Sequence, residues 1–295
     1  MIKNNRVNIV KSIRKQSDFS FSKNTTYGCG GNARIAYYPE SIRQATSLFD
    51  YLKDSATPFI VLGNGSNVLA SDSGYDGAVI STKNLKGVYR TGKTIYCRAG
   101  TKVSQLMKFC IENGAGGLEY LAGIPATLGG LALMNGGADS KYICSNIVSV
   151  KFYDGKMRKI LNKNCNFGNK YSIMRDINGI ILGVELTYEP QDGEKVMQNI
   201  RRRLDGRAPL PKGKSCGCVF KNPSGYSAGK LIDEAGLKGL TYGTACVSGE
   251  HANFIINKGG RAADVYALIG RVKNEVYARF GILLEEEVVY IGDMQ

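Results

Sequence analysis

The chain has 295 residues, of which 43% are apolar, and its formal net charge is +14. This length and composition allow a sizeable core, exclude a disordered or fibrous protein, and predict two or three compact units. The N-terminal segment lacks the apolar run of a signal peptide, and no stretch approaches the ~18 apolar residues of a membrane span. We therefore expect a cytoplasmic protein with no membrane segment.

The positive charge is concentrated in residues 1–15 and 201–214, which raises nucleic acid as one class of partner. No recognition helix with interleaved aromatic residues accompanies these segments. Net charge is informative about solubility and association but says little about fold. We expect a solvated basic surface, or one that attracts small anions, and no nucleic-acid partner.

The eight cysteines occur with a single histidine and without any CxxC pair. In a reducing compartment free thiols are the default, so the even count does not predict disulfides. Cys216-Gly217-Cys218 has no second pair at zinc-like spacing, and we expect no metal site. Cys218 is then either a packed core thiol or a reacting group.

The first expected unit covers residues 1–85. Apolar residues at helical spacing predict a helix over 41–55. Residues 58–71 indicate a strand, a glycine loop and a second strand, and residues 77–81 indicate another strand. This order predicts a small α/β subdomain.

The second expected unit, 86–192, is α+β, and a basic helix and loop over 193–210 link it to a third unit, 211–295. In the second unit we expect strands at 94–100 and 179–190, a hairpin over 146–161 with its turn at Asp154-Gly155, a helix at 103–114 and another that starts with Pro125. In the third unit we expect helices at 226–239 and 262–281 and strands at 252–260 and 284–292.

Two glycine-rich segments are candidates for phosphate binding. Residues 62–67, LGNGSN, follow an apolar strand, so successive N–H groups can form an anion nest. The GxGxxG spacing of a dinucleotide fingerprint is absent, and for this loop taken alone an ordinary glycine turn is the favoured interpretation. In residues 122–137, Gly129 and Gly130 would each cost a helix ~1 kcal/mol, which close packing or contact with a flat cofactor would offset.

Seven segments, in order over nearly the whole chain, carry a resemblance to a known family. The chain resembles the UDP-N-acetylenolpyruvoylglucosamine reductases (MurB), the flavoenzymes of peptidoglycan precursor synthesis, and their shorter subclass in particular. The matching segments are NTTYGCGGNARIAYYPES (24–41), VLGNGSNVLASDSGYDGAVI (61–80), GLEYLAGIPATLGGLALMNGG (117–137), GCVFKNP (217–223), AGKLIDEAGLKG (228–239), HANFIIN (251–257) and LEEEVVYIG (284–292).

The resemblance implies an α+β fold: a two-subdomain FAD-binding unit of the p-cresol methylhydroxylase type, followed by a C-terminal α/β substrate-binding domain. It also implies the cofactors, FAD and NADPH, and a UDP-sugar substrate whose enolpyruvyl ether is reduced to give UDP-N-acetylmuramate. We expect the enzyme to be a monomer.

The resemblance assigns the proton donor to Cys218, where the family usually has serine, and a second acidic group to Glu287. A thiol with a pKa near ~8.5 is a far better acid than an alcohol and is mostly protonated at neutral pH. A buried inert thiol is the competing reading of Cys218.

One departure from the family pattern bears on activity. Aligned on Phe167, Gly168 and Ser172, the usual tyrosine and arginine of FGYRxS become Asn169 and Lys170. Lysine keeps the positive charge that would stabilise the enolate but loses the planar fork of arginine. The chain therefore either performs the family reaction with Lys170, or is an FAD-dependent oxidoreductase on the same fold with weakened or changed substrate use.

The remaining expected site residues follow from the same matched segments. Lys221 and Asn222 are expected to bind substrate, although Asn-Pro is also a turn signal. Ala126 and Asp139-Ser140 are smaller departures beside the flavin segments. The residues expected to bind FAD are Tyr37, Gly63, Asn64, Gly65, Ser66, Asn67, Gly123, Ile124, Pro125, Thr127, Gly129, Gly130, Asn135 and Gly137.

Overall fold

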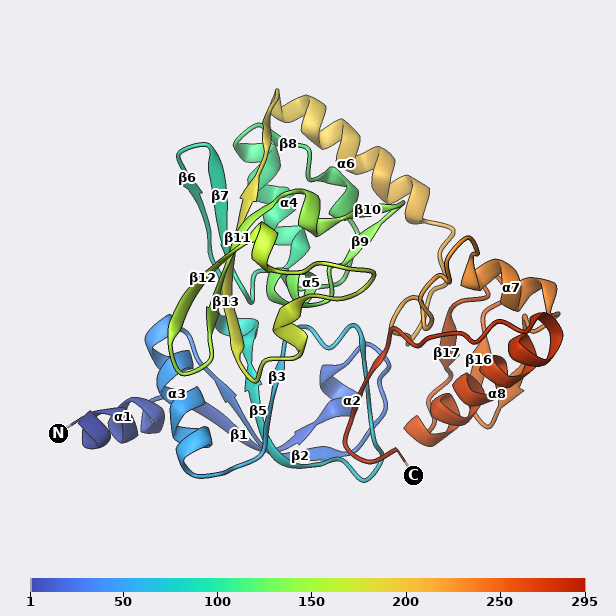
Figure 1. Cartoon of the computed structure of the whole chain (residues 1–295), viewed down its shortest axis with the longest axis horizontal. Coiled ribbons are helices and arrows are strands. Elements are labelled where there is room, and N and C mark those ends of the chain that lie inside the picture. The colour runs from blue at the N-terminus through green and yellow to red at the C-terminus, as the bar shows by residue number, and fades with distance from the viewer. Residues whose placement is uncertain (1, 295) are drawn as a thin grey trace. The chain divides into compact units, whose positions relative to one another are not determined.

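The computed structural model describes residues 2–294, which divide into two compact units (Figure 1). The first unit contains the residues up to Gln16 together with 35–64 and 77–208; the second contains 17–34, 65–76 and the residues from Pro209 onward. The three-part division made from the sequence remains a prediction. None of the described helices is long and apolar enough to cross a membrane.

The centre of the first unit is a five-stranded antiparallel sheet in the order β12-β11-β13-β7-β6. Alternating burial along β11 puts Val150 and Phe152 into the core, as expected for a sheet with one covered face. The predicted hairpin is confirmed, with Gly155 at φ 107° in its turn. The strands are β6 (Val88–Thr91), β7 (Thr94–Arg98), β11 (Ile147–Tyr153), β12 (Met157–Leu161) and β13 (Ile180–Thr187).

Helices α4 (Val103–Glu112) and α5 (Leu128–Leu133) cover one face of this sheet, and α6 (Gly193–Arg207) packs on the outside of α4 (Figure 1). The prediction that α5 starts with Pro125 is wrong, because Thr127 is still extended and the Ala126 carbonyl accepts a hydrogen bond from the Val103 N–H.

A second sheet has four strands in the order β1-β2-β5-β3. The chain passes from one unit to the other within β1, β2 and β5. The predicted helix α3 is confirmed, and the Ser41 side chain caps it by accepting from the Gln44 N–H. The elements here are α1 (Ile2–Lys11), β1 (Arg14–Ser20), β2 (Asn32–Tyr38), α3 (Ile42–Asp54), β3 (Phe59–Leu62) and β5 (Tyr75–Ser81).

Short elements complete the first unit. They are η1 (Thr82–Asn84), β8 (Ala115–Gly116), η2 (Glu119–Leu121), β9 (Gly137–Ala138), β10 (Lys141–Tyr142), η3 (Ile143–Ser145), η4 (Asn162–Asn164), η5 (Ile173–Arg175) and β14 (Glu189–Pro190).

The second unit packs around α8, whose buried face is the one predicted from its apolar spacing. The predicted strand over 284–292 is shorter than expected, because only β18 forms a regular ladder, in parallel with β4. The elements of this unit are α2 (Phe21–Asn24), β4 (Val68–Ala70), α7 (Ala228–Glu234), β15 (Thr241–Tyr242), β16 (Ala245–Val247), β17 (Ile255–Asn257), α8 (Ala262–Phe280) and β18 (Val289–Ile291).

The N-terminus of α8 depends on a distant carboxylate. Asp72 accepts hydrogen bonds from the N–H groups of Ala262 and Ala263 at 2.9 and 3.0 Å. We expect Asp72→Ala to lower the free energy of unfolding by about 1 kcal/mol, because two helix N–H groups lose their acceptor. Urea unfolding followed by circular dichroism measures this. Arg261→Ala is the control, because its side chain is 74% exposed and its 3.7 Å ion pair with Asp72 is a weak surface contact. Equal losses in the two variants would contradict the capping role.

Candidate functional site

The first glycine loop lies against residues 125–127. A Cβ added to Gly63 would lie 2.5 Å from the Thr127 hydroxyl oxygen, so only glycine fits there. The Asn64 amide donates to the Pro125 carbonyl at 2.7 Å. Four residues predicted separately from two segments therefore lie together in the first unit.

This place offers hydrogen-bonding groups that the described part of the chain does not use. The Thr127 side chain is 2% exposed, and its buried hydroxyl has no partner among the described residues. The backbone N–H of Asn64, in the same unit, likewise has no backbone acceptor among the described residues. A buried polar group without a partner calls for an explanation, and a free N–H beside a free hydroxyl suits an anion.

Other predicted cofactor residues have packing roles of their own. Gly129, in α5, packs against Ala99, the residue that follows β7, and an added Cβ would come within 2.9 Å of the Ala99 methyl carbon. Gly137 is required by the β9–β10 hairpin, because an added Cβ would collide with the Lys141 carbonyl oxygen. Gly130 has only an ordinary contact with Thr127, at 3.5 Å. Close packing therefore explains Gly129 without a ligand.

The segment before α5 combines an exposed turn with a packed side chain. Gly123 is exposed, with φ 80°, whereas Ile124 packs against the core of the first unit. Tyr37 also packs against a hydrophobic core, the one that contains Phe49 of α3. Burial raises the pKa of the Tyr37 hydroxyl. Tyr37, expected from the sequence to bind FAD, thus has a packing role in this structure.

Lys170 occupies a two-residue turn. Gly168 and Tyr171 pair across it, and Lys170 has φ 55°, a left-handed conformation uncommon for lysine. The Lys170 carbonyl accepts a hydrogen bond from the Arg175 guanidinium at 2.9 Å. Tyr171 donates to the Asp176 carboxylate. Tyr171 and Arg175, the two neighbours that could replace the missing tyrosine and arginine, thus brace the turn in this structure.

In the second unit, Cys218 and Glu287 are neighbours on hydrogen-bonded segments. Cys218 is half-buried and forms an antiparallel bridge with Phe254. The next residue, Val219, accepts at its carbonyl a 2.7 Å hydrogen bond from the Glu287 N–H. Backbone pairing therefore places the carboxylate-bearing segment directly beside the thiol-bearing one.

Asn67 anchors the same arrangement to the glycine loop. Its side-chain amide donates to the Glu287 carbonyl at 3.0 Å, and its own carbonyl accepts from the Val289 N–H at 3.0 Å. Asn67 was predicted as a cofactor residue, and these bonds give it a positioning role within the second unit.

Two functional residues were missed from the sequence. The buried Asn253 side chain bonds both the N–H and the carbonyl of Phe220, at 2.9 and 2.8 Å, and so orients the segment that carries Cys218. Asn257 bonds the Tyr27 carbonyl at 2.9 Å. The available signal was the two asparagines in the otherwise apolar HANFIIN, since buried amides must find partners.

Cys216 lies in the hydrophobic core of the second unit. Burial raises the pKa of its thiol to about 12, and the nearby charges of Glu287 and Cys218 act in the same direction. Cys216 is therefore a neutral packed thiol, as expected for a residue outside the matched position.

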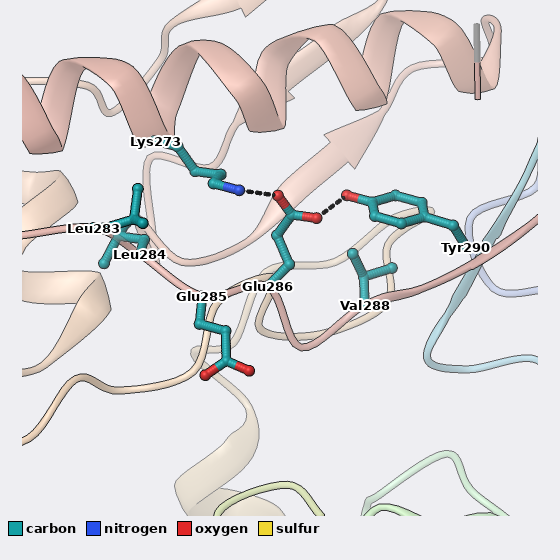
Figure 2. A pocket seen from close by; sticks show the side chains of 7 residues that line it. All are labelled: Lys273, Leu283, Leu284, Glu285, Glu286, Val288 and Tyr290. Carbon is teal, nitrogen blue, oxygen red and sulfur yellow. Dashed lines mark hydrogen bonds and ion pairs between the residues drawn. The ribbon is translucent and has the colours of Figure 1, made fainter. Parts of the chain in front are cut away.

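The other two carboxylates of the LEEEV segment are engaged elsewhere. Figure 2 shows Glu286 directed toward α8, where it bonds Lys273 at 2.5 Å and the Tyr290 hydroxyl at 2.6 Å. Glu285 points the opposite way and pairs with Lys221 (Figure 2). A surface pocket lies here, lined by Lys273, Leu283, Leu284, Glu285, Glu286, Val288 and Tyr290. Glu285 and Glu286 thus both form ion pairs with lysines.

The predicted substrate residues also have intramolecular contacts. Lys221 is 13% exposed and pairs with Glu285, while the Asn222 side chain accepts from the Ala228 N–H at 3.0 Å. His251 accepts from the Asn253 N–H at 3.2 Å, and burial lowers the pKa of its imidazole. His251 is therefore a bonded residue that orders the loop before Asn253.

Comparisons with known proteins agree with this geometry. Residues 33–160 match the family model of an FAD binding domain, and residues 208–291 match that of the UDP-N-acetylenolpyruvoylglucosamine reductase C-terminal domain. The chain is 35% identical to the UDP-N-acetylenolpyruvoylglucosamine reductase of Pediococcus pentosaceus, with 92% of each chain covered. It is also 35% identical to that of Clostridioides difficile, with 98% of this chain and 97% of the relative covered.

A solved structure extends the match to three dimensions. The crystal structure of the Thermus caldophilus UDP-N-acetylenolpyruvylglucosamine reductase (MurB) superposes with a TM-score of 0.81 at 34% identity, covering 95% of this chain and 99% of that one. Fold and glycine loops thus define an FAD-binding α+β protein with the p-cresol methylhydroxylase type of flavin domain. The chain belongs to the UDP-N-acetylenolpyruvoylglucosamine reductase family.

The residues present fit an FAD cofactor. The glycine at position 63 leaves open a space that a Cβ would fill, and the orphaned Thr127 hydroxyl lies beside it. Together with the backbone N–H of Asn64 in the same unit, this hydroxyl offers donors suited to a phosphate oxygen.

We expect Gly63→Ala to reduce the FAD content of the purified protein, because the methyl group would collide with Thr127 where the loop must stay open. Absorbance of the bound flavin relative to protein measures the loss. Gly206→Ala in exposed α6 is the control, since an added Cβ there meets nothing within 4 Å. Full flavin loading of Gly63→Ala would show that this cradle does not hold the cofactor.

Proposed function

We propose that this protein is an FAD-containing oxidoreductase that uses NADPH to reduce UDP-N-acetylenolpyruvoylglucosamine to UDP-N-acetylmuramate, a step of peptidoglycan precursor synthesis. The observation that carries the proposal is family membership over almost the whole chain. We propose Cys218 as the acid, because the resemblance assigns that role to its position and a thiol is a competent proton donor. The half-buried setting of Cys218 supports it, since a proton donor must be reachable.

FAD, when bound, would supply the hydride chemistry that couples NADPH to the vinyl carbon of the enolpyruvyl ether. Two groups of residues are proposed to hold FAD. The glycine loop would bind the diphosphate through Gly63, Asn64, Gly65, Ser66 and Asn67. The second segment would supply Gly123, Ile124, Pro125, Thr127, Gly129, Gly130, Asn135 and Gly137, of which Thr127 offers the clearest side-chain donor.

Cys218 is proposed to donate its thiol proton to the carbon next to the one that receives hydride. The product gains one hydride and one proton across the double bond, and Cys218 is left as a thiolate that regains a proton from solvent. Glu287, held beside this segment by its bond to Val219, is proposed to relay that proton. General-acid work of this kind contributes typically 10²- to 10⁴-fold to rate.

Lys170 is proposed to stabilise the negative charge that develops on the substrate carboxylate in the enolate. Its ammonium would keep the electrostatic stabilisation that an arginine would give, which is often the largest single contribution to catalysis. Lys221 and Asn222 are proposed to contact the diphosphate or uridine, which requires Lys221 to exchange its pairing with Glu285 for a phosphate oxygen.

A second candidate function keeps the fold and the flavin but changes the substrate. Asn169-Lys170 favours this alternative, because a point charge replaces a planar fork at a carboxylate-binding position. Turnover separates the two: NADPH oxidation that accelerates on adding UDP-N-acetylenolpyruvoylglucosamine supports the first function. A flavin-loaded protein without such acceleration supports the second.

We also propose that the enzyme acts as a cytoplasmic monomer. All eight cysteines are free, which suits a reducing compartment, and NADPH and UDP-sugars are supplied in the same one. Light scattering coupled to gel filtration measures the mass against the 32.0 kDa of the chain.

We expect Cys218→Ala to retain reduction of the flavin by NADPH but to lose product formation by about 10²-fold or more, because the proton donor is gone. Stopped-flow absorbance separates the two half-reactions. Cys216→Ala is the matched control one glycine away, and it should retain both, since Cys216 is a buried packing residue. Normal product formation by Cys218→Ala would remove the thiol from the mechanism.

We expect Lys170→Arg to support turnover at least as well as the parent, because arginine restores two parallel bonds to a carboxylate. Steady-state NADPH oxidation with the UDP-sugar measures this. A collapse of kcat would mean that the site has been rebuilt around lysine, contrary to a simple replacement of arginine.

A further inference from the structure

The ammonium group of Lys170 lies over an aromatic ring. Its Nζ atom is 5.9 Å from the centroid of the Tyr142 ring, within the range of a cation–π interaction. Tyr142 is the last residue of β10 and is half-buried. Its backbone carbonyl accepts from the Ser145 hydroxyl at 2.8 Å and from the Tyr120 hydroxyl at 3.3 Å, so the ring projects from a well-anchored strand end.

A buried amide joins this strand end to the turn that carries Lys170. Asn135 is 3% exposed, and its side chain donates to the Gly168 carbonyl at 2.9 Å. The same side chain accepts from the Cys144 N–H, two residues after Tyr142, at 3.2 Å. One side chain therefore connects the backbone next to Lys170 with the backbone next to Tyr142.

Further bonds hold the turn on its other side. The Ser172 hydroxyl is fully buried and donates to the Leu133 carbonyl at 2.7 Å, just before Asn135 in the chain. Together with the Arg175 bond to the Lys170 carbonyl, this holds a left-handed lysine in place. Such a conformation costs about 1 kcal/mol or more and persists only where its surroundings impose it.

We propose that Tyr142 and Asn135 are positioning residues for Lys170: the ring holds the ammonium and the amide holds the backbone of its turn. This inference rests on the proposed role of Lys170. A lysine is a point charge on a flexible stem, so on its own it lacks the directional grip of a guanidinium. The Tyr142 ring would limit the rotamers of the Lys170 side chain and so hold its ammonium group in one position.

Asn135 thus has a second role besides the cofactor contact predicted for it. Both polar atoms of its side chain are occupied by protein groups, and its φ of 43° suits asparagine or glycine. Its side chain acts within the protein, on the turn of Lys170.

The oxidation of the reduced enzyme by UDP-N-acetylenolpyruvoylglucosamine tests the inference. We expect Tyr142→Leu to slow this half-reaction about three- to tenfold, in line with the strength of a cation–π pair, and to leave reduction by NADPH unchanged. Tyr142→Phe is the matched control and should keep the parent rate, because the ring face remains. Asn135→Gly, which preserves the backbone conformation, should slow the same half-reaction.

A double-mutant cycle distinguishes positioning from general disruption. Tyr142→Leu should slow the oxidation much less in a Lys170→Met background than in the parent, because the ring then has no ammonium to hold. The same cycle measured by thermal unfolding should also show coupling, and this readout does not depend on activity. Additive effects in both readouts, or a Tyr142→Phe variant as slow as Tyr142→Leu, would overturn the inference.

The design separates failure of the inference from failure of the proposed function. A parent enzyme whose reduced flavin is not oxidised by the UDP-sugar contradicts the function, and the unfolding cycle alone then decides whether the ring and the ammonium interact. A parent enzyme that reacts normally, with no coupling between positions 142 and 170, contradicts the inference and leaves the function standing.

Discussion

The Glu287 N–H donates to the Val219 carbonyl over 2.7 Å, and much of the second unit's proposed chemistry depends on that bond. It brings the segment carrying the carboxylate alongside the segment carrying Cys218. Backbone bonds of this kind are insensitive to the side chains they carry. The arrangement therefore does not depend on whether position 218 carries a thiol or a hydroxyl.

Buried asparagines perform the supporting work in both units. The buried Asn253 saturates both backbone groups of Phe220, and the buried Asn135 connects the turn of Lys170 to the end of β10. The half-buried Asn67 bonds the Glu287 carbonyl in the same way. An amide carries a donor and an acceptor without a charge, so it can bridge two backbone segments with a small desolvation cost once both atoms are bonded. Loops that lack regular ladders thus gain fixed positions.

The fold and the site differ in how far the sequence could reveal them. Helices α3 and α8 and the β11–β12 hairpin follow from apolar periodicity and turn residues, which are local signals. The start of α5 was misplaced because Pro125 is a residue suited to the first turn of a helix. In the structure the Ala126 carbonyl instead accepts a hydrogen bond from the Val103 N–H, 23 positions earlier in the chain. Strands β1 and β2 lack a strong alternation and were not predicted.

The candidate site shows the same division between local and distant information. Cys218, Glu287 and the glycine loops could be found because each lies in a recognisable short segment. The partners of Asn253, and the ring beneath Lys170, involve side chains brought together from distant positions, for which short motifs carry no signal.

The bond between Asn67 and Glu287 spans 220 positions of the chain. Closing so long a loop carries an entropic cost, and contacts of this separation form slowly compared with local ones. During synthesis on the ribosome, the glycine loop emerges long before the residues that anchor its far side. Maturation of the reductase is therefore a late event in folding, and a nascent chain that stops short of Glu287 can contain every glycine of the loop and still lack its anchor.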